Sequence, residues 1–490
     1  MCGFLGILDP DHDVIGLLYN GLQTLQHRGQ DSAGFATFDS MFHIKKGNGL
    51  VRDMIEPRHF ERLKGHMGIA HVRYPTIGGG TEHDAQPFET FHPYGIAMAH
   101  NGNVVNYHAL KKELIAGGRH INSGCDVEVI MAVFAESLAR SGKLDQESVF
   151  AAVAEVFARV KGAYSCVALI ARFGLVVFRD PSGIRPCSLG RRQGAHGTAW
   201  AAASESVAFG LMGYDWVGDL GAGEAMIIPH DASEPLRRRI APEANTKPCI
   251  FEYIYFARPD SVIDTLGVHS LRKDLGRTLA AKVRSLNVKA DVVIPVPDSA
   301  RVAAQAMAVE LGIPYSEGLV KNRYVGRTFI MASQSQRQSS IRSKLTPVES
   351  EIRGKHVLLV DDSIVRGNTS ARIVEMVRGA GALSVTLASY SPPVLHPCYY
   401  GIDMSRREEL VAHGRNLEQI RRIIGCDQLI YQDLKDMLAS ARSLAPKVQG
   451  FCNACFSGEY PVAGIEDKDM ESLAADRDRG DLPLWQAVPG

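Results

Sequence analysis

Two adjacent carboxylates, Asp361 and Asp362, follow an apolar run and precede a stretch of small polar side chains. The run, at residues 357–360, is rich in branched side chains and predicts a buried parallel strand. Gly367 and the small polar residues at 368–370 then lead into a helical pattern. Backbone N–H groups at the start of a helix bind phosphate, and paired carboxylates bind ribose hydroxyls or a hard divalent cation. The stretch therefore predicts a sugar-phosphate site, although many adjacent aspartates belong only to a solvated turn.

A second kind of chemistry is possible at the start of the chain, where Cys2 follows the initiator methionine. Removal of Met1 would leave Cys2 as the first residue. Its own α-amine, which titrates at about pH 8, could then accept the thiol proton without a separate histidine. Taken alone, Cys2 could equally be a chance second residue in a first strand.

Four of the nine cysteines could form a metal or thiol site. Cys452 and Cys455 form a C-x-x-C pair, while Cys249 and Cys398 lie far from them in the sequence. This pattern is compatible with structural zinc, with redox thiols or with unrelated core cysteines. An odd number of cysteines in a long chain argues against a secreted disulfide framework.

The sugar-phosphate site needs a parallel sheet to position it. Asp291–Val296 predicts one strand, and Val302–Leu311 predicts the helix that follows and ends at Gly312. Leu383–Ala388 predicts a further strand. Ligands of such sheets lie over the carboxyl ends of the strands, so Ser299 should face the same crevice as the two aspartates.

Composition limits the class of protein. The chain has 490 residues, of which 45% are hydrophobic, and its 54 basic and 54 acidic residues cancel. A neutral chain of this kind gives no indication of a nucleic-acid or membrane partner, and we expect a small anionic substrate. No long apolar segment or basic leader is present in the sequence, which predicts a soluble cytoplasmic protein.

The domain organisation follows from one change in composition. A polar, proline-containing stretch at Pro229–Pro248 predicts a boundary, and we interpret Arg237–Arg239 within it as solvated linker charge. We expect one domain at residues 2–240 and a second at 250–462. The remaining segment, 463–490, is acidic and then Pro- and Gly-containing, which is typical of a poorly ordered tail.

Three strings in the first half resemble the N-terminal-nucleophile glutamine amidotransferases: Gln26–Gly34, His71–Thr76 and His100–Val104. The resemblance implies an α+β domain of αββα architecture in which Cys2 attacks the amide of glutamine. It assigns Asn101 and Gly102 to the oxyanion hole, where a glycine lets the backbone come close. It assigns Arg73 to the glutamine carboxylate and Asp126 to the amino group.

The stretch at 355–370 resembles the phosphoribosyl pyrophosphate signature of phosphoribosyltransferases, and its fuller form resembles the amidophosphoribosyltransferases. The resemblance implies an α/β domain with a mainly parallel sheet and a Mg²⁺ ion near Ser299, Asp361 and Asp362. The residues that it assigns to phosphoribosyl pyrophosphate are Asp361, Asp362, Ser363, Arg366, Gly367, Thr369, Ser370, Arg327 and Lys344. The basic segment Lys321–Lys344 resembles the family's flexible loop and suits a lid. The chain departs from the family patterns at Cys125, Val127 and Asn368.

The iron-sulfur-containing subset of the same family has cysteines in contexts like those of this chain. By that resemblance Cys249, Cys398, Cys452 and Cys455 bind a structural [4Fe-4S] cluster, because four thiolates complete its ligation.

Together the resemblances imply an enzyme that releases ammonia from glutamine and uses it to displace pyrophosphate from 5-phosphoribosyl 1-pyrophosphate. The product would be 5-phosphoribosylamine, in the first step of purine synthesis. Family members are homo-oligomers, often tetramers, and are inhibited by purine nucleotides. Two alternatives are another N-terminal-nucleophile amidotransferase and a nucleotide-binding regulatory protein that kept the fold. Pyrophosphate release that requires both substrates would distinguish the enzyme from these alternatives.

Overall fold

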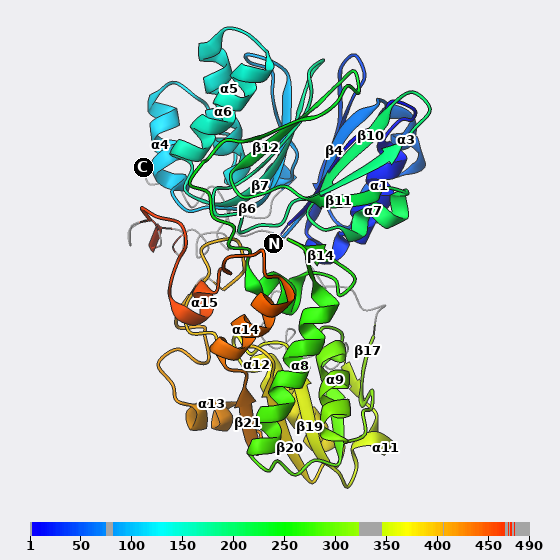
Figure 1. The fold of residues 1–490 in the computed structure, drawn as a ribbon, viewed down its shortest axis with the longest axis vertical. Coiled ribbons are helices and arrows are strands. Elements are labelled where there is room, and N and C mark those ends of the chain that lie inside the picture. Colours follow the sequence, from blue (N-terminus) through cyan, green and yellow to red (C-terminus); the bar gives the residue numbers. More distant parts are fainter. Residues whose placement is uncertain are drawn as a thin grey trace.

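The computed structural model describes residues 2–74, 82–322, 345–404 and 406–465, together with 469, 471, 472 and 475. Figure 1 shows two halves stacked along the long axis of the molecule, with the N-terminal half above and the parallel sheet of the second half below. The segment that carries α15 (Ala454–Ser457) lies between the two halves. The last described part of the chain therefore lies beside the junction.

Within the described residues, the N-terminal half contains two antiparallel sheets. The first has the strand order β11 (Asp215–Asp219), β9 (Ser188–Gln193), β10 (Thr198–Ala203), β1 (Gly3–Leu8), β4 (Met67–Arg73), β2 (Ser32–Phe38) and β3 (Phe42–Asn48). The second has the order β13 (Leu236–Arg239), β12 (Glu224–Pro229), β8 (Gly174–Arg179), β7 (Gly162–Ile170), β6 (Ile96–Val104) and β5 (Phe88–Thr90).

Helices cover the outer face of each sheet (Figure 1). Those on the first sheet are α1 (Ile15–Thr24), α2 (Val51–Met54), α3 (Pro57–Arg62) and α7 (Val207–Met212); those on the second are α4 (Tyr107–Ala116), α5 (Asp126–Ser141) and α6 (Gln146–Arg159). Phe4 and Ile69 of the first sheet pack against Val167 and Val177 of the second in one buried cluster. This helix, sheet, sheet, helix arrangement confirms the αββα architecture.

The second half contains a parallel sheet with helices on both faces. Its strands are β16 (Val292–Pro295), β19 (His356–Asp361), β20 (Ser384–Ser389) and β21 (Gln428–Tyr431), in that order. The helices on one face are α8 (Val268–Ser285), α9 (Arg301–Leu311) and α14 (Leu434–Leu444), and those on the other are α12 (Asn368–Gly379) and α13 (Leu417–Ile424).

The central strand of this sheet shows why its sequence is a continuous apolar run. Leu358 and Val360 belong to the cluster beneath α8 and α9, whereas Val357 and Leu359 belong to the cluster beneath α12. Both faces of the strand are buried, as is usual for a parallel sheet. The strand expected at residues 357–360 is thereby confirmed as the inner part of β19.

Shorter elements complete the described chain. They are β14 (Val262–Ile263), β15 (Leu266–Gly267), β17 (Leu319–Lys321), β18 (Leu345–Pro347), α11 (Glu349–Ile352), the 3₁₀ turns η1 (Gln26–Arg28) and η2 (Glu82–Asp84), and the π-helical turn η3 (Glu252–Phe256). None of the described helices combines the length and the apolar content that a membrane-crossing helix needs.

One sequence interpretation is wrong. Arg237–Arg239 are not linker residues, because they belong to β13, which pairs with β12 at the edge of the second sheet. Arg237 contacts Glu224 and Arg238 contacts Glu147, so both cations have carboxylate partners on the sheet surface. Charged residues on an exposed edge strand also discourage pairing with another chain. Composition alone did not distinguish this charged edge strand from a linker.

Candidate functional site

Cys2 lies directly before β1, and its side chain is only 6% exposed. The Cys2 backbone nitrogen is 3.4 Å from Oδ1 of Asn101, and its thiol donates to the Tyr74 carbonyl oxygen at 3.6 Å. The neighbouring residue Gly3 pairs with Val72 of β4. The nucleophile candidate is therefore held between strands that also carry the residues expected around it.

Asn101 and Gly102 lie on β6. Nδ2 of Asn101 is buried and has no hydrogen-bond partner among the described residues, although Oδ1 of the same side chain is 3.4 Å from the Cys2 nitrogen. A Cβ atom at Gly102 would lie 2.0 Å from the Ala163 carbonyl oxygen, so the strand pairing admits only glycine there. A buried amide donor on a side chain that contacts the Cys2 backbone thus has no partner among the described residues, which is costly unless a ligand accepts its hydrogen bond.

Arg73 ends β4 and Asp126 begins α5, and both side chains are buried. Oδ2 of Asp126 accepts from the Val104 N–H at 2.9 Å, and Oδ1 lies 3.3 Å from His100 Nε2. Burial opposes ionisation of Asp126, but His100, the Val104 N–H and Arg73 together keep its pKa below the usual value.

The charge of Arg73 interacts with two other residues expected at this site, Cys2 and Asp126. Burial disfavours its charge, but nearby acidic groups, among them Cys125, Asp84, Cys2 and Asp126, raise its pKa overall. The site offers a thiol, an amide donor, a guanidinium and a carboxylate. Such a set can attack a carbonyl carbon while it holds both charged ends of an amino acid.

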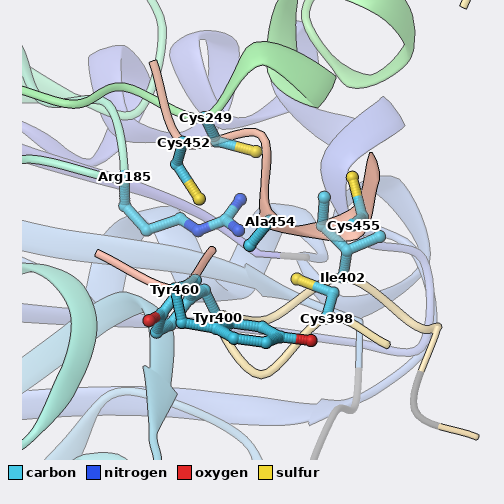
Figure 2. Close-up of a pocket in the computed structure, with 9 residues that line it drawn as sticks. All are labelled: Arg185, Cys249, Cys398, Tyr400, Ile402, Cys452, Ala454, Cys455 and Tyr460. Carbon is cyan, nitrogen blue, oxygen red and sulfur yellow. The ribbon is translucent and has the colours of Figure 1, made fainter. Parts of the chain in front are cut away.

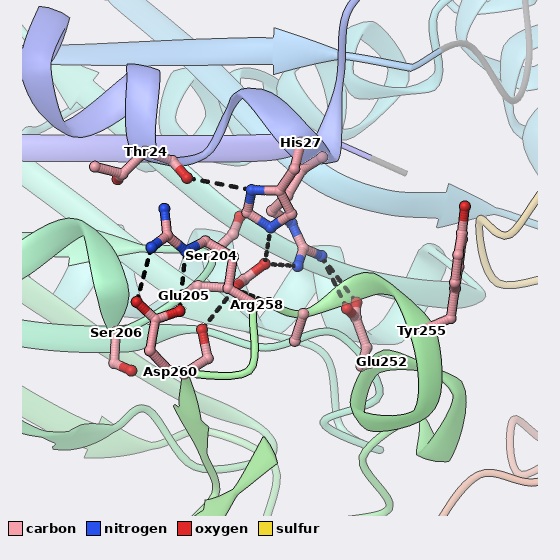
Figure 3. A network of polar contacts seen from close by, with 12 residues as sticks. Thr24, His27, Ser204, Glu205, Ser206, Glu252, Tyr255, Arg258 and Asp260 are labelled. Atoms are coloured by element: carbon pink, nitrogen blue, oxygen red, sulfur yellow. Dashed lines mark hydrogen bonds and ion pairs between the residues drawn. The ribbon is translucent and has the colours of Figure 1, made fainter. Parts of the chain in front are cut away.

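A network of ion pairs behind Cys2 was not predicted from the sequence. Nε of Arg28 donates to the Cys2 carbonyl oxygen at 2.9 Å, and Nη2 bonds both oxygens of Glu252 at 2.9 and 3.1 Å. Nη1 of Arg28 bonds Glu205, which His27 also contacts at 2.8 Å (Figure 3). Arg28 lies within the string Gln26–Gly34, which marked the region without indicating this role.

The second candidate site lies at the carboxyl end of β19. Asp362 accepts hydrogen bonds from the hydroxyls of Ser299 and Ser363, and its own N–H donates to Asp361 at 2.9 Å. Burial raises the pKa of both aspartates, and the charge of Asp362 raises that of Asp361 further. The structure therefore brings Ser299 to the aspartate pair, as the sheet topology predicted.

The residues after the aspartates form the start of α12. Gly367 precedes the helix with a φ of +77°, a conformation that favours glycine, and Thr369 and Ser370 lie in the first turn. Arg366 bonds Glu409 at 2.9 Å. The two remaining residues assigned to this site by resemblance, Arg327 and Lys344, lie outside the described residues.

A short loop, Tyr399–Asp403, contacts both sites. Asn103, next to Gly102, donates from its amide to the Tyr399 carbonyl oxygen at 2.9 Å. The Tyr74 hydroxyl donates to Asp403 at 3.2 Å, and Asp403 lies 3.8 Å from Arg366. A Cβ atom at Gly401 would lie 3.0 Å from the Gly102 carbonyl oxygen. The loop therefore packs against the strand of Gly102 and reaches the start of the phosphate-binding segment.

The four cysteines expected to act together line one cavity (Figure 2). The lining residues are Arg185, Cys249, Cys398, Tyr400, Ile402, Cys452, Ala454, Cys455 and Tyr460. All four thiols are free and buried. Burial raises the pKa of Cys249 to about 11 and those of Cys452 and Cys455 well above their usual value.

Backbone hydrogen bonds fix the chain segments around this cavity. Cys249 and Cys452 form a parallel bridge, with the Ile250 N–H bonded to the Cys452 carbonyl at 3.0 Å. The Leu395 N–H bonds the Cys455 carbonyl at 2.9 Å, which brings the Cys398 segment beside the C-x-x-C pair. Within the described residues, no three of the cysteine sulfur atoms lie within 4.8 Å of one another.

Two family models each match one half of the chain, and curated relatives match nearly its whole length. A model of the glutamine amidotransferase domain matches residues 71–210, and a model of the phosphoribosyl transferase domain matches residues 263–391. The amidophosphoribosyltransferase of Escherichia coli K12 is 46% identical over 96% of this chain and 95% of its own length. That of Saccharomyces cerevisiae is 45% identical over 98% of this chain and 96% of its own length.

Solved structures give the same result. The glutamine phosphoribosylpyrophosphate amidotransferase of B. subtilis, complexed with ADP and GMP, is 40% identical with a TM-score of 0.84, and the match covers 95% of this chain and 98% of that one. A structure described as the allosteric regulatory enzyme of purine biosynthesis is 39% identical with a TM-score of 0.85, and the match covers 96% of this chain and 97% of that one.

We predict that Arg28→Met lowers the free energy of unfolding by about 3 kcal/mol or more, because it leaves two buried carboxylates without their shared cation. Chemical denaturation of the full chain measures this loss. Arg422→Met is the matched control, since Arg422 is exposed and its ion pair with Glu418 lies on the surface, and it should cost about 1 kcal/mol or less. Equal losses in the two variants would contradict a stabilising role for the Arg28 network.

Proposed function

The chain belongs to the amidophosphoribosyltransferases, and on that premise we propose that its two sites carry out the two halves of one reaction. Cys2 releases ammonia from glutamine, and the ammonia displaces pyrophosphate from 5-phosphoribosyl 1-pyrophosphate to give 5-phosphoribosylamine. The observation that carries this proposal is the buried amide donor of Asn101, whose side chain contacts the Cys2 backbone nitrogen, in the same chain as the Asp361–Asp362 pair.

In the glutamine half, the Cys2 sulfur bonds to the amide carbon, and the carbonyl oxygen becomes an oxyanion. Nδ2 of Asn101 and the Gly102 N–H donate to that oxygen. The α-amine of Cys2, which removal of Met1 would free, accepts the thiol proton and passes it to the amide nitrogen, so that ammonia leaves when the tetrahedral intermediate collapses to a thioester. Water then hydrolyses the thioester, which releases glutamate and restores the thiol. Arg73 holds the carboxylate of glutamine, and Asp126 holds its amino group.

In the ribose half, the carboxyl end of β19 holds the phosphoribosyl group. Backbone N–H groups at the start of α12 bind phosphate, and the residues around this helix start are Ser363, Gly367, Thr369 and Ser370. Positive charge toward the phosphates comes from Arg366 and, in the lid segment, from Arg327 and Lys344. Closure of the lid would exclude water, which competes with ammonia at the anomeric carbon.

A Mg²⁺ ion fits the Asp361–Asp362 pair. The two carboxylates are buried next to each other and have raised pKa values, so a hard cation would relieve both burial and mutual repulsion. Ser299, Asp361 and Asp362 would hold it, directly or through water. The ion would supply charge that offsets the leaving pyrophosphate.

The route of ammonia between the sites is also part of the proposal. Free ammonia is largely protonated at neutral pH and is then not nucleophilic, so direct transfer favours the reaction. The loop Tyr399–Asp403 contacts Asn103 and Tyr74 on one side and Arg366 on the other. We place the passage beside this loop.

For the four cysteines we propose a structural [4Fe-4S] cluster instead of zinc. A single tetrahedral zinc ion with Zn–S bonds of about 2.3 Å needs sulfur atoms about 3.8 Å apart. In the described residues no three of these sulfurs lie within 4.8 Å of one another. A cubane spreads its ligands more widely, because each thiolate binds a different iron. The wider spacing supports the cluster.

The remaining features of the proposal rest on the family. We expect a homo-oligomer, often a tetramer in this family, that is located in the cytoplasm and inhibited by purine nucleotides. The B. subtilis relative is described with ADP and GMP, and the second solved relative as an allosteric regulatory enzyme. The domain ranges 2–240 and 250–462 and the tail at 463–490 are likewise proposals.

We predict that Cys2→Ala abolishes glutamine-dependent synthesis, while ammonia at high pH still supports it, because the ribose site is intact. Asn101→Ala should lower the glutamine-dependent kcat about 100-fold or more through loss of an oxyanion donor. Pyrophosphate release with each nitrogen source measures both effects. Asn106→Ala is the control, since the Asn106 amide bonds the backbone of Arg159 and Lys161. Glutamine-dependent turnover by Cys2→Ala would contradict the assignment of the nucleophile.

We predict that Asp361→Asn and Asp362→Asn each lower both the glutamine-dependent and the ammonia-dependent rates about 100-fold or more, because both reactions use the same ribose site. Steady-state pyrophosphate release with either nitrogen source measures this. Asp433→Asn is the control, because Asp433 is exposed and its partner is the surface residue Lys282. Wild-type rates with ammonia in either aspartate variant would remove that residue from the ribose site.

We predict that the anaerobically purified protein is brown, is oxygen-sensitive and contains about four irons and four sulfides per chain. Cys452→Ser should lose both iron and solubility, because the cluster ties three chain segments together. Metal and sulfide analysis with visible absorption checks this. Cys426→Ser is the matched control, since Cys426 is buried but does not line the cavity. A colourless, active preparation with one zinc per chain would show that the metal is wrong without changing the enzyme assignment.

A further inference from the structure

Arg185 reaches into the cavity of the four cysteines (Figure 2). Its side chain is 0% exposed, and it is the one charged residue among the described residues that line the cavity. The other lining side chains are the thiols, two tyrosines, an isoleucine and an alanine. A buried guanidinium requires compensating negative charge nearby, because burying a charge is costly unless opposite charge is close.

The position of Arg185 is fixed from both ends. Its carbonyl oxygen accepts from Nε of Arg179 at 2.7 Å and from the Ser165 hydroxyl at 3.0 Å. Its Nη1 donates to Oε1 of Glu252 at 3.0 Å. The cation is therefore held at the cavity wall by the fold, so that no reorganisation is needed when the cysteines bind a metal group.

Glu252 is shared by two arginines. Nη2 of Arg28 bonds both Glu252 oxygens, at 2.9 and 3.1 Å, and Nη1 of Arg28 bonds Glu205, so Arg28 and Arg185 together balance these two carboxylates. The larger unbalanced charge in this part of the protein would come from the cysteines. Four thiolates around an oxidised [4Fe-4S] core carry about two negative charges in total.

We propose that Arg185 is the buried counter-charge of the iron-sulfur cluster, held against the cysteines by Glu252. This inference rests on the cluster assigned under the proposed function. The guanidinium stabilises the negatively charged cluster, slows its loss and favours its reduction, since reduction adds a further negative charge. Arg185 is thus a positioning residue with an electrostatic effect on the cluster and no contact with either substrate.

The test compares charge changes of opposite sign in the anaerobically purified full chain. Arg185→Met removes the cation, Arg185→Lys keeps it, and Glu252→Gln removes the neighbouring anion. Potentiometric titration followed by electron paramagnetic resonance gives the reduction potential of each. We expect Arg185→Met to disfavour reduction about tenfold, which is about 60 mV for one electron, and Glu252→Gln to favour it in the opposite direction. Arg185→Lys should stay within about threefold of the wild type.

Two further measurements separate the charge effect from general damage. Arg272→Met is the control for loss of a buried arginine, because Arg272 bonds backbone carbonyls of Tyr253, Tyr255 and Ala257 outside the cavity. It should leave the potential unchanged. The half-time of bleaching in air should shorten several-fold in Arg185→Met and not in Arg185→Lys.

The possible results decide between the two proposals. Equal potentials in the wild type, Arg185→Met and Glu252→Gln, or shifts of the same sign in the two variants, would overturn the role of Arg185 while leaving the cluster in place. A wild type without iron and sulfide would overturn the cluster itself and this inference with it. If Arg185→Met does not fold, the Glu252→Gln and Arg185→Lys pair still decides, because an unchanged potential in Glu252→Gln would refute the electrostatic role.

Discussion

The structure depends on a chain of buried ion pairs that crosses the junction between its halves. Arg28 of the N-terminal half bonds Glu205 of the same half and Glu252 of the junction, and Glu252 also bonds Arg185. Removing one partner from such a buried set leaves an uncompensated charge, so the halves have a strong preference for the one arrangement that pairs them all. Because Arg28 also holds the Cys2 carbonyl oxygen, this arrangement fixes the candidate nucleophile as well.

Both candidate sites are positioned by strand ends, but for different reasons. In the parallel sheet, β19 is buried on both faces, and the first places where polar side chains can collect are beyond its carboxyl end, at Asp361 and Asp362. In the antiparallel sheets, β1 and β4 are paired, with Gly3 opposite Val72, so the residues just outside that pairing, Cys2 and Arg73, lie close together. Regular pairing thus determines where irregular, reactive positions occur.

The sequence was most informative where one local pattern decided the structure. The apolar run before Asp361 and the helix ended by Gly312 are both local features, and the structure has each of them. The architecture of the first half came from resemblance, since its sheets pair strands distant in sequence. Arg28 and Arg185 could not be assigned from local pattern, because their partners lie 224 and 67 residues away. The edge strand at Arg237–Arg239 was missed because its charges are the same as those of an exposed linker.

The cysteine cavity is connected to both candidate sites through the chain that follows Cys398. Cys398 lies directly before Tyr399–Asp403, the loop that contacts Asn103 and Tyr74 at one site and Arg366 at the other. The loop returns to the same point, because the Cys398 N–H bonds the Met404 carbonyl oxygen at 2.7 Å. The two ends of the loop are therefore held together next to Cys398. Metal binding at four buried thiols would fix these ends more firmly than packing alone, since it adds bonds between segments that are far apart in the chain. A metal site at these cysteines would thus contribute to both reactions by fixing the loop between them.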